Sequence, residues 1–315
     1  MLEAILLVGG QGTRLRPLTI STPKPMLPVA GYSCTEHQIA LARKAGVGRI
    51  VMGTSYRAEV FEEHFGHGEK VGVELVYAVE DEPLGTGGAI RNAAAHLTCG
   101  PDDPVVVFNG DVLTGLDIAG LVQKWRDADA DVALYLTRVE DPRAYGCVPL
   151  NSEGRVLEFL EKMENPIADT INAGCYIFNS GALAMIPRNT VVSVEREIFP
   201  ALLDEDFDVF GYHDGRYWID MGTPGSYIKA SKDLILNPAI SPATRGVVDG
   251  VMIAKDAAVD ATAIISDGSA IESGAVIGAN CQIKGSIISA GASIGDGSII
   301  DNCYIAPNVS IASNE

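Results

Sequence analysis

Three positively charged residues near the N-terminus are the strongest candidates for a chemical role in this sequence. Arg14, Arg16 and Lys24 lie between Glu3 and Glu36, and this interval contains no acidic residue. The whole chain is acidic, because 23 Lys and Arg stand against 41 Asp and Glu, which gives a formal net charge of -18. A positive cluster within so acidic a chain predicts a local binding site for an anion such as phosphate.

Lys24 lies between two prolines, Pro23 and Pro25. Because proline fixes the backbone, the lysine side chain stands on a stiff support, as a phosphate clamp requires. A surface lysine in a proline-rich loop is the alternative interpretation.

A glycine-rich segment, Gly9-Gly10-Gln11-Gly12, follows an apolar run and precedes Arg14. Glycines let backbone N–H groups approach an anion closely, so we predict a phosphate-binding loop here. It is not a Walker A loop, because no Gly-Lys-Ser/Thr follows, and Leu15 stands where a dinucleotide-binding fingerprint needs a small residue. A simple strand-to-helix turn would show the same glycine spacing.

Two carboxylates follow predicted strands. Asp111 comes after residues 105–109 and Gly110, and Asp220 leaves a later strand. Two such carboxylates could hold one hard divalent cation, with waters and phosphate oxygens completing its shell. An Asp near a Gly is also a common turn residue, so neither carboxylate alone indicates a metal.

A pattern of alternating strands and helices must position these residues. Apolar β-rich runs predict strands at 4–8, 49–54, 73–79, 105–109 and 132–137, with later strands at 171–179 and 208–219. Such alternation predicts an α/β fold with a Rossmann-like, mostly parallel sheet covered on both faces, and ligands at the carboxyl ends of its strands.

Helix boundaries are marked by capping residues. Ser33 to Glu36 has capping-box spacing at the start of a helix that stops at Gly46. A second helix is expected from near Thr86 through Leu97. A second glycine cluster, at 80–89, joins a strand to the start of this helix and could cradle a base or ribose. Thr223-Pro224 opens a third helix, which Asn237-Pro238 closes.

After about residue 247 an aliphatic residue recurs every six positions. The first series is Ile253, Val259, Ile265, Ile271, Ile277 and Ile283, followed with one-residue slips by Ile288, Ile294, Ile300, Ile305 and Ile311. A small residue stands four positions after successive aliphatic residues, at Ala257, Ala263, Ser269, Ala275 and Cys281. This period predicts a parallel β-helix. We therefore predict two domains, 1–240 and 247–315.

Composition and charge exclude several function classes. The acidic balance disfavours binding to nucleic acid or to an anionic membrane. The apolar run at 4–8 has no preceding basic residue and ends at Gly9-Gly10, so we expect neither a signal peptide nor a membrane span. Six scattered cysteines without a CxxC pattern fit reduced thiols and a cytoplasmic location.

Taken together, the motifs resemble those of the sugar-1-phosphate nucleotidyltransferases over nearly the whole chain, most closely the members that make GDP-mannose. The matching segments are 9–19, 23–28, 82–88, 109–111, 159–162, 171–174, 194–200 and 220–223. The hexapeptide repeats also resemble a family whose β-helices wind left-handed with three sides per coil, which implies roughly three coils.

The resemblance implies a role for each matching residue. Catalysis would rest on Arg14, Lys24, Asp111 and Asp220, and the last two would bind Mg²⁺. The implied nucleotide contacts are Val8, Gly9, Gly10, Gly12, Thr13, Arg14, Lys24, Glu80, Gly85, Thr86, Asn109 and Asp111. The implied contacts to the sugar phosphate are Gly146, Glu161, Lys162, Asn172 and Gly174.

The implied reaction joins GTP and mannose 1-phosphate by direct attack on the α-phosphorus, with pyrophosphate leaving. The nucleophile is already ionised, so no general base is needed, and the protein must supply alignment and cations. Glu80 is our candidate for guanine, because a carboxylate can accept from both N1–H and the 2-amino group. Backbone carbonyls could do the same, and a solvated loop acid is the alternative for Glu80.

Three other functions compete with this one. The same chemistry could use another hexose 1-phosphate with UTP, dTTP or ATP, and a catalytically silent relative would sense nucleotide sugars. A hexapeptide acyltransferase would use a histidine base, but the last histidine is His213, before the repeat. The repeat shows no obvious polar cap, so we expect a homo-oligomer that forms through the β-helix.

Overall fold

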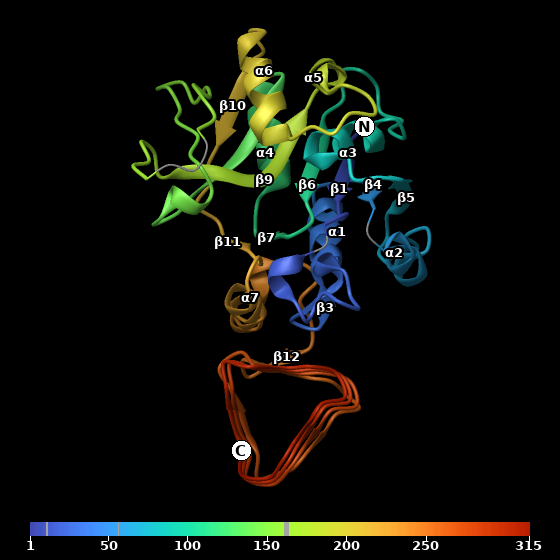
Figure 1. Cartoon of the computed structure of the whole chain (residues 1–315), viewed down its shortest axis with the longest axis vertical. Helices are drawn as coiled ribbons and strands as arrows, with labels where there is room; N and C mark the ends of the chain where they lie inside the picture. Colours follow the sequence, from blue (N-terminus) through green and yellow to red (C-terminus); the bar gives the residue numbers. More distant parts are fainter. Residues whose placement is uncertain (11, 56, 161–163) are drawn as a thin grey trace. The chain divides into compact units, whose positions relative to one another are not determined.

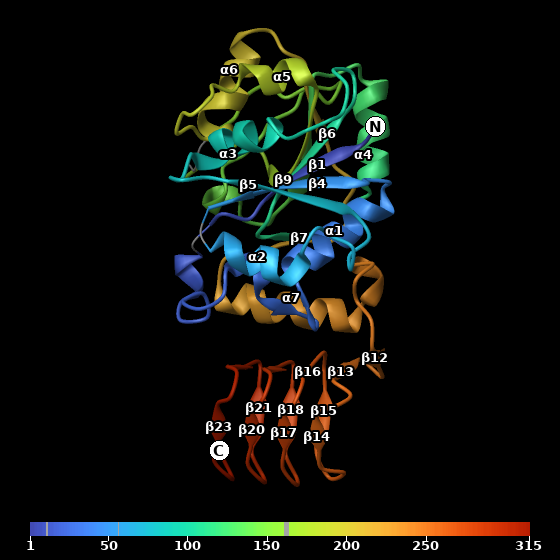
Figure 2. The ribbon, with the colours of Figure 1, turned by 90° about the vertical axis from the view of Figure 1, so that its right-hand side faces the viewer.

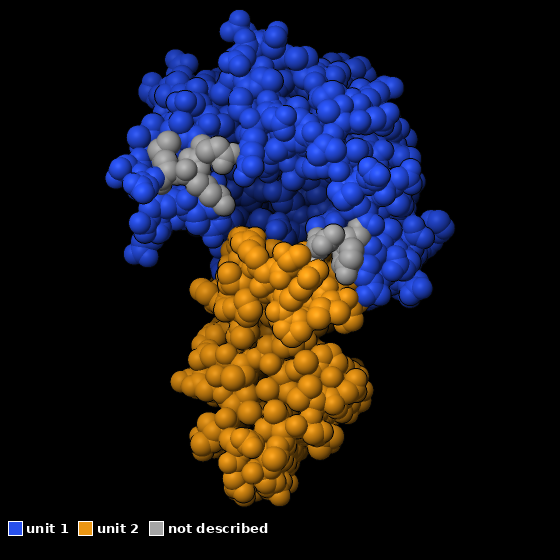
Figure 3. Space-filling view, in the orientation of Figure 1, with its two compact units in different colours: residues 1–11, 38–218 blue, residues 12–37, 219–315 orange. Residues whose placement is uncertain are grey.

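The computed structural model describes residues 1–10, 12–55, 57–160 and 164–315. The chain divides into two compact units, each built from separate stretches of sequence (Figure 3). Unit 1 comprises Met1–Gln11 and Gln38–Trp218, and unit 2 comprises Gly12–His37 and Ile219–Glu315. The domain division expected from the sequence stays a prediction, although the strands of the repeat do begin at Val247.

A seven-stranded sheet forms the centre of unit 1 (Figure 1). In spatial order its strands are β10 (Val209–Tyr212), β8 (Val132–Arg138), β9 (Thr170–Phe178), β6 (Val105–Asn109), β1 (Glu3–Leu7), β4 (Arg49–Thr54) and β5 (Glu74–Val79). Only β9 runs antiparallel to its neighbours in the pairings that the described strands make. The predicted mostly parallel sheet is therefore confirmed.

Consecutive residues of the central strands are buried, as a sheet covered on both faces requires. In β1, Ala4 and Ile5 are fully buried although they point to opposite faces. The helices that flank the sheet lie on both sides of it (Figure 2). They are α2 (Ala58–Phe65), α3 (Gly85–Ala94), α4 (Ile118–Asp127), α5 (Ser180–Met185), α6 (Phe199–Asp204) and α1 (Cys34–Lys44), whose first turn belongs to unit 2.

Two predicted elements differ from the structure. The predicted strand 208–219 is wrong as one element, because β10 ends at Tyr212 and β11 (Trp218–Asp220) is separate. Gly215, with a φ of 68°, turns the chain between them, and the Asp214 carboxylate accepts from the Arg216 N–H at 3.0 Å. Helix α3 ends at Ala94, so Leu97 lies beyond it.

The N-terminal part of unit 2 is mostly irregular. It contains the short helices η1 (Thr13–Leu15) and η2 (Lys24–Met26) and the hairpin of β2 (Pro28–Val29) and β3 (Tyr32–Ser33). Later in the chain, α7 (Pro224–Leu236) starts with a capping box between Thr223 and Ser226, as predicted. The other predicted capping box is confirmed as well, because Ser33 and Glu36 exchange hydrogen bonds at the start of α1.

The repeat forms a parallel β-helix whose three sheets make a triangle in Figure 1. Coils stack along its length in Figure 2. One sheet consists of β12 (Val247–Val248), β13 (Val251–Ile253), β16 (Ala270–Ile271), β19 (Ile287–Ile288) and β22 (Tyr304–Ile305). The second consists of β14 (Ala258–Val259), β17 (Val276–Ile277), β20 (Ser293–Ile294) and β23 (Ser310–Ile311), and the third of β15 (Ile264–Ser266), β18 (Gln282–Lys284) and β21 (Ile299–Asp301).

The predicted aliphatic positions align one above another in this β-helix. Ile271 pairs with Ile288, and Ile283 pairs with Ile300, in parallel register. These side chains form one buried core. The six-residue period and the predicted parallel β-helix are therefore confirmed.

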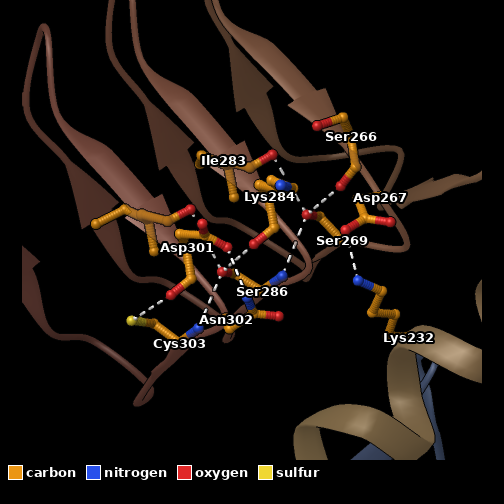
Figure 4. Close-up of polar contacts among 11 residues, drawn as sticks. Lys232, Ser266, Asp267, Ser269, Ile283, Lys284, Ser286, Asp301, Asn302 and Cys303 are labelled. Carbon is orange, nitrogen blue, oxygen red and sulfur yellow. Dashed lines mark hydrogen bonds and ion pairs between the residues drawn. The ribbon is translucent and has the colours of Figure 1, made fainter.

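Small residues build a polar ladder at one corner of the coils (Figure 4). The Ser269 hydroxyl donates to Ser266 O at 2.7 Å and accepts from the Ser286 N–H at 3.2 Å. One coil later, the Ser286 hydroxyl donates to Lys284 O and accepts from the Cys303 N–H. Serine at these positions therefore satisfies backbone groups that the tight corner leaves unpaired.

No helix in the described part of the chain has both the length and the apolar character to cross a membrane. All six cysteines are free thiols.

Candidate active site

Lys24 is held inside unit 2 rather than on its surface. Its side chain is only 7% exposed, and its Nζ lies 3.4 Å from Asp220 Oδ1. The two prolines set η2, because Pro23 precedes the helix and Pro25 occupies its first turn. The alternative of a surface lysine is therefore wrong.

Arg14 lies beside the same carboxylate. A Cβ on Gly222 would stand 2.9 and 3.0 Å from the terminal nitrogens of Arg14, and 3.0 Å from Asp220 Oδ2. Gly222 thus leaves space between a guanidinium and a carboxylate. Unit 2 brings Arg14 and Lys24 together with Asp220, which is far from both in the sequence.

Gly12, the last glycine of the glycine-rich segment, lies against Lys24. Gly12 has a φ of 59°, and a Cβ there would stand 2.8 Å from Lys24 Cβ. The Thr19 hydroxyl donates to Gly12 O at 2.8 Å and closes the loop. Glycine is required here both by the left-handed backbone and by the close approach.

Asp111 occupies the turn between β6 and β7 (Val112–Thr114) in unit 1. Gly110 precedes it because a Cβ there would stand 2.3 Å from Leu7 O. The side chain of Gln38, on α1, donates to the carbonyls of Asn109 and Val112, both at 2.8 Å. Sequence reasoning missed this role of Gln38, because only the fold brings α1 to that turn.

Glu80 follows β5 and carries a buried acceptor. Its Oε2 accepts from the Leu84 N–H at 3.3 Å, and its Oε1 is buried without a partner in the described part of the chain. Burial raises the pKa of this carboxyl, although the bond from Leu84 opposes the shift. An unsatisfied buried acceptor fits the predicted pairing with two donors.

The second glycine cluster packs against a neighbouring segment. The N–H of Gly87 donates to Val192 O at 2.9 Å, and a Cβ on Gly85 would stand 2.7 Å from that oxygen. The Thr86 hydroxyl donates to Glu195 Oε2 at 2.9 Å and accepts from the Val194 N–H. These glycines therefore have a packing role, and the nucleotide contacts of Gly85 and Thr86 stay a prediction.

Unit 1 contains a cavity of about 580 Å³ that the predicted sugar residues Gly146 and Asn172 line, together with Asn109 and Glu195. Next to it, the rings of Tyr145 and Trp218 meet edge to face at 5.7 Å, and Tyr145 lines the cavity. The predicted contacts Glu161 and Lys162 lie outside the described residues.

A buried hydroxyl connects the polar residues of this cavity. The Tyr176 hydroxyl accepts from Asn172 Nδ2 at 2.9 Å and from Asn109 Nδ2 at 3.2 Å, and it donates to Glu195 Oε1 at 3.2 Å. Gly174, with a φ of 75°, lets β9 pass close to Asn109. Tyr176 was not predicted, because its position in an apolar strand makes it look like an ordinary core residue.

No group of three or more His, Cys, Asp or Glu side chains gathers to hold a metal ion among the described residues. The predicted metal ligands are two carboxylates, of which Asp111 belongs to unit 1 and Asp220 to unit 2. Mg²⁺ is commonly held by one or two carboxylates with substrate phosphates and waters, and its binding by Asp111 and Asp220 stays a prediction.

Comparison with known proteins supports the resemblance to nucleotidyltransferases that the motifs indicate. Residues 3–237 match the model of the family described as nucleotidyl transferase. The mannose-1-phosphate guanylyltransferase of Mycobacterium tuberculosis is 47% identical over 300 residues, which cover 95% of this chain and 83% of the relative. The mannose-1-phosphate guanylyltransferase catalytic subunit beta of Drosophila pseudoobscura is 35% identical over 270 residues, covering 85% and 72%.

Solved structures share the fold. HddC from Yersinia pseudotuberculosis matches with a TM-score of 0.65 and 28% identity, over 74% of this chain and 100% of that chain. The structure of HddC complexed with GMP-PN matches over the same shares with a TM-score of 0.63 and 28% identity.

Proposed function

Because the chain belongs to the nucleotidyl transferase family, we propose that it transfers the guanylyl group of GTP to mannose 1-phosphate, giving GDP-mannose and pyrophosphate. The observation that carries the reaction class is the buried Lys24–Asp220 pair beside Arg14. The choice of base and sugar is supported by the 47% identity to the mycobacterial enzyme.

The residues of this chain act by alignment and charge. An oxygen of the sugar phosphate attacks the α-phosphorus, the bond to the β-phosphate oxygen breaks, and pyrophosphate leaves with that electron pair. Arg14 and Lys24 neutralise the charge that builds up on the phosphates, and Lys162 grips the sugar phosphate. One such cationic donor contributes on the order of 3 kcal/mol at the transition state, or about a hundredfold in rate.

Asp111 and Asp220 are the proposed ligands of Mg²⁺. The ion would supply positive charge to the crowded phosphate oxygens. Lys24 Nζ approaches Asp220 at 3.4 Å, so the same carboxylate also orients the lysine toward the phosphate site.

Glu80 is the proposed determinant of the base. Its buried Oε1 lacks a partner among the described residues, and guanine offers two adjacent donors. We expect Glu80→Gln to lower the preference for GTP over ATP and UTP by at least tenfold. An unchanged preference in a competition assay would show that other groups read the base.

The sugar site is proposed to be the 580 Å³ cavity. Glu161 and Asn172 would contact the hydroxyls, and Gly146 and Gly174 would belong to the same sugar-phosphate site. The Tyr176 network fixes Asn172 in place. Glucose and mannose differ in the orientation of one hydroxyl. The pocket must therefore bind that hydroxyl in one orientation only, in addition to being polar.

Pyrophosphate release is the measurement that tests the function. Wild-type protein should release it from GTP and mannose 1-phosphate faster than from any pairing of ATP, UTP or dTTP with mannose or glucose 1-phosphate. Release from none of these pairs would favour a nucleotide-sugar sensor, and a faster alternative pair would change the substrates.

We also propose that the chain self-associates through the β-helix and functions in the cytoplasm. Outward-facing aliphatic side chains support self-association, since Ile264 is 62% exposed and Ile299 63% exposed. Free cysteines fit a reducing compartment. If light scattering at micromolar concentration shows a monomer, the proposal of self-association is refuted. If cell fractionation releases the protein with the periplasmic fraction, the proposal of a cytoplasmic location is refuted.

A further inference from the structure

Helix α7 holds the segment that follows Lys24. The Tyr227 hydroxyl donates to Pro28 O at 2.6 Å, and Ser231 Oγ accepts from the Ala30 N–H at 3.0 Å. Both α7 side chains are only 1% exposed. Ala30 adopts a φ of 46°, so the turn of the β2–β3 hairpin needs such support.

The β-helix also contacts α7. The ring of Tyr227 meets the ring of Tyr304 at 5.6 Å, and Lys232 forms an ion pair with Asp267 (Figure 4). Gly268 is required at that corner, because a Cβ there would stand 2.8 Å from the backbone oxygen of Lys232. Tyr304 and Asp267 belong to different coils, so α7 contacts more than one coil of the β-helix.

The β-helix also touches the hairpin directly. A Cβ on Gly31 would stand 2.7 Å from Sδ of Met252, which lies in β13. The hairpin turn therefore lies against α7 on one side and against the first coil on another.

Both members of the Lys24–Asp220 pair are tied to this helix. Asp220 stands three residues before Thr223, whose capping box starts α7. Lys24 stands four residues before Pro28, and Pro25 in that interval restricts the backbone. Helix α7 is thus linked to both charged groups through three or four residues of backbone.

We propose that Tyr227 and Ser231 are positioning residues, through which α7 and the β-helix hold Lys24 at the distance from Asp220 that triphosphate binding requires. This inference rests on the proposed function, because it gives the β-helix a part in the same phosphate site. The β-helix is then a support for catalysis as well as a surface for assembly.

Tyr227→Phe tests the proposal because it removes the bond to Pro28 and keeps the ring on Tyr304. We expect the affinity for GTP and for inorganic pyrophosphate, measured by calorimetry, to fall about fivefold to tenfold, which is the loss expected for one buried hydrogen bond. The KM for GTP should rise by a similar factor. The KM for mannose 1-phosphate should stay the same.

Tyr304→Phe is the matched control, because it removes a hydroxyl from the same ring pair without touching the hairpin. It should leave both affinities unchanged. Ser231→Ala removes the second bond and should weaken triphosphate binding as well, so it provides the test if Tyr227→Phe proves too unstable to purify. A purely structural role would lower the unfolding midpoint of both α7 variants and leave the affinities at the wild-type value, which would overturn the proposal.

Lys24→Ala separates this inference from the proposed function. If that variant loses pyrophosphate binding while the Tyr227 and Ser231 variants keep it, the α7 link is wrong and the phosphate site stands. If all three variants bind as wild type does, both proposals fail.

Discussion

At the scale of the residue, Lys24 is a buried cation in a chain with a formal net charge of -18. Burial of a charged group is costly unless it is paired, and Asp220 supplies the partner at 3.4 Å. A surface lysine would interact with a phosphate through water and contribute much less.

Substitution of Lys24 by Ala removes this charge from the proposed phosphate site. We expect kcat/KM for GTP to fall about a hundredfold, which corresponds to roughly 3 kcal/mol. Steady-state release of pyrophosphate measures it. Lys124→Ala, on the exposed surface of α4, is the control and should have no effect. A loss of less than threefold in Lys24→Ala would show that other groups carry the charge stabilisation.

Gln38 acts at the same scale on the proposed metal site. Gln38→Glu replaces a donor to two carbonyls by an acceptor, and Gln38 is only 4% exposed. We expect a loss of about 1–3 kcal/mol in the free energy of unfolding and a requirement for at least tenfold more Mg²⁺. The comparison is Gln123→Glu, whose side chain is exposed on α4. An unchanged Mg²⁺ requirement would show that the Gly110–Asp111 turn does not depend on Gln38.

At the scale of the element, the β-helix is stabilised by layers of inward aliphatic side chains. Each strand is only two or three residues long, so its local preference is small and its stability comes from the coils above and below. Outward positions of the same strands are exposed, as at Ile299, which is 63% exposed.

Ile283→Ala opens a cavity in this core, because Ile283 is fully buried. We expect a loss of about 2–5 kcal/mol in the free energy of unfolding, measured by denaturant titration. Ile299→Ala removes the same atoms from an outward position and should change stability by less than about 0.5 kcal/mol. Equal losses in the two variants would contradict the inward and outward assignment of these strands.

At the scale of the whole molecule, the stability of unit 2 should depend on pH through Glu272. Burial raises the pKa of this carboxyl from 4.5 to about 7. The hydrogen bond that it accepts from the Ala290 N–H lowers the pKa and so opposes this shift. The hydroxyls of Tyr227 and Tyr304 lie nearby. The folded state therefore keeps a proton that the unfolded state loses above pH 4.5. This contribution is complete below that pH and is lost as the pH rises to about 7.

The free energy of unfolding should consequently fall between pH 5.5 and pH 7, by at most about 1.4 kcal/mol per pH unit from this group. Chemical denaturation at several pH values measures the slope. Glu272→Gln should flatten it, because glutamine does not titrate. A variant with the wild-type slope would show that other carboxyl groups cause the dependence.

Features that depend on local spacing can be predicted from the amino-acid sequence alone. The six-residue period identified the β-helix, the capping residues located the starts of α1 and α7, and apolar runs located most strands of the sheet. These signals are local because side-chain periodicity and backbone caps involve residues only a few positions apart. The family motifs identified Lys24 and Asp220 as members of one site, but not the contact between them.

Contacts between residues that are distant in the sequence could not be predicted in this way. Gln38 at the Gly110–Asp111 turn, Tyr176 between Asn109 and Glu195, and Tyr227 at Pro28 each join segments that no spacing rule connects. Gln38 and Tyr227 donate to backbone carbonyls, and Tyr176 bonds to side chains of other segments, so all three contacts depend on how strands and helices pack. In the sequence, each of these residues looks like an ordinary core residue, because the contact that gives it a role forms only when the chain folds.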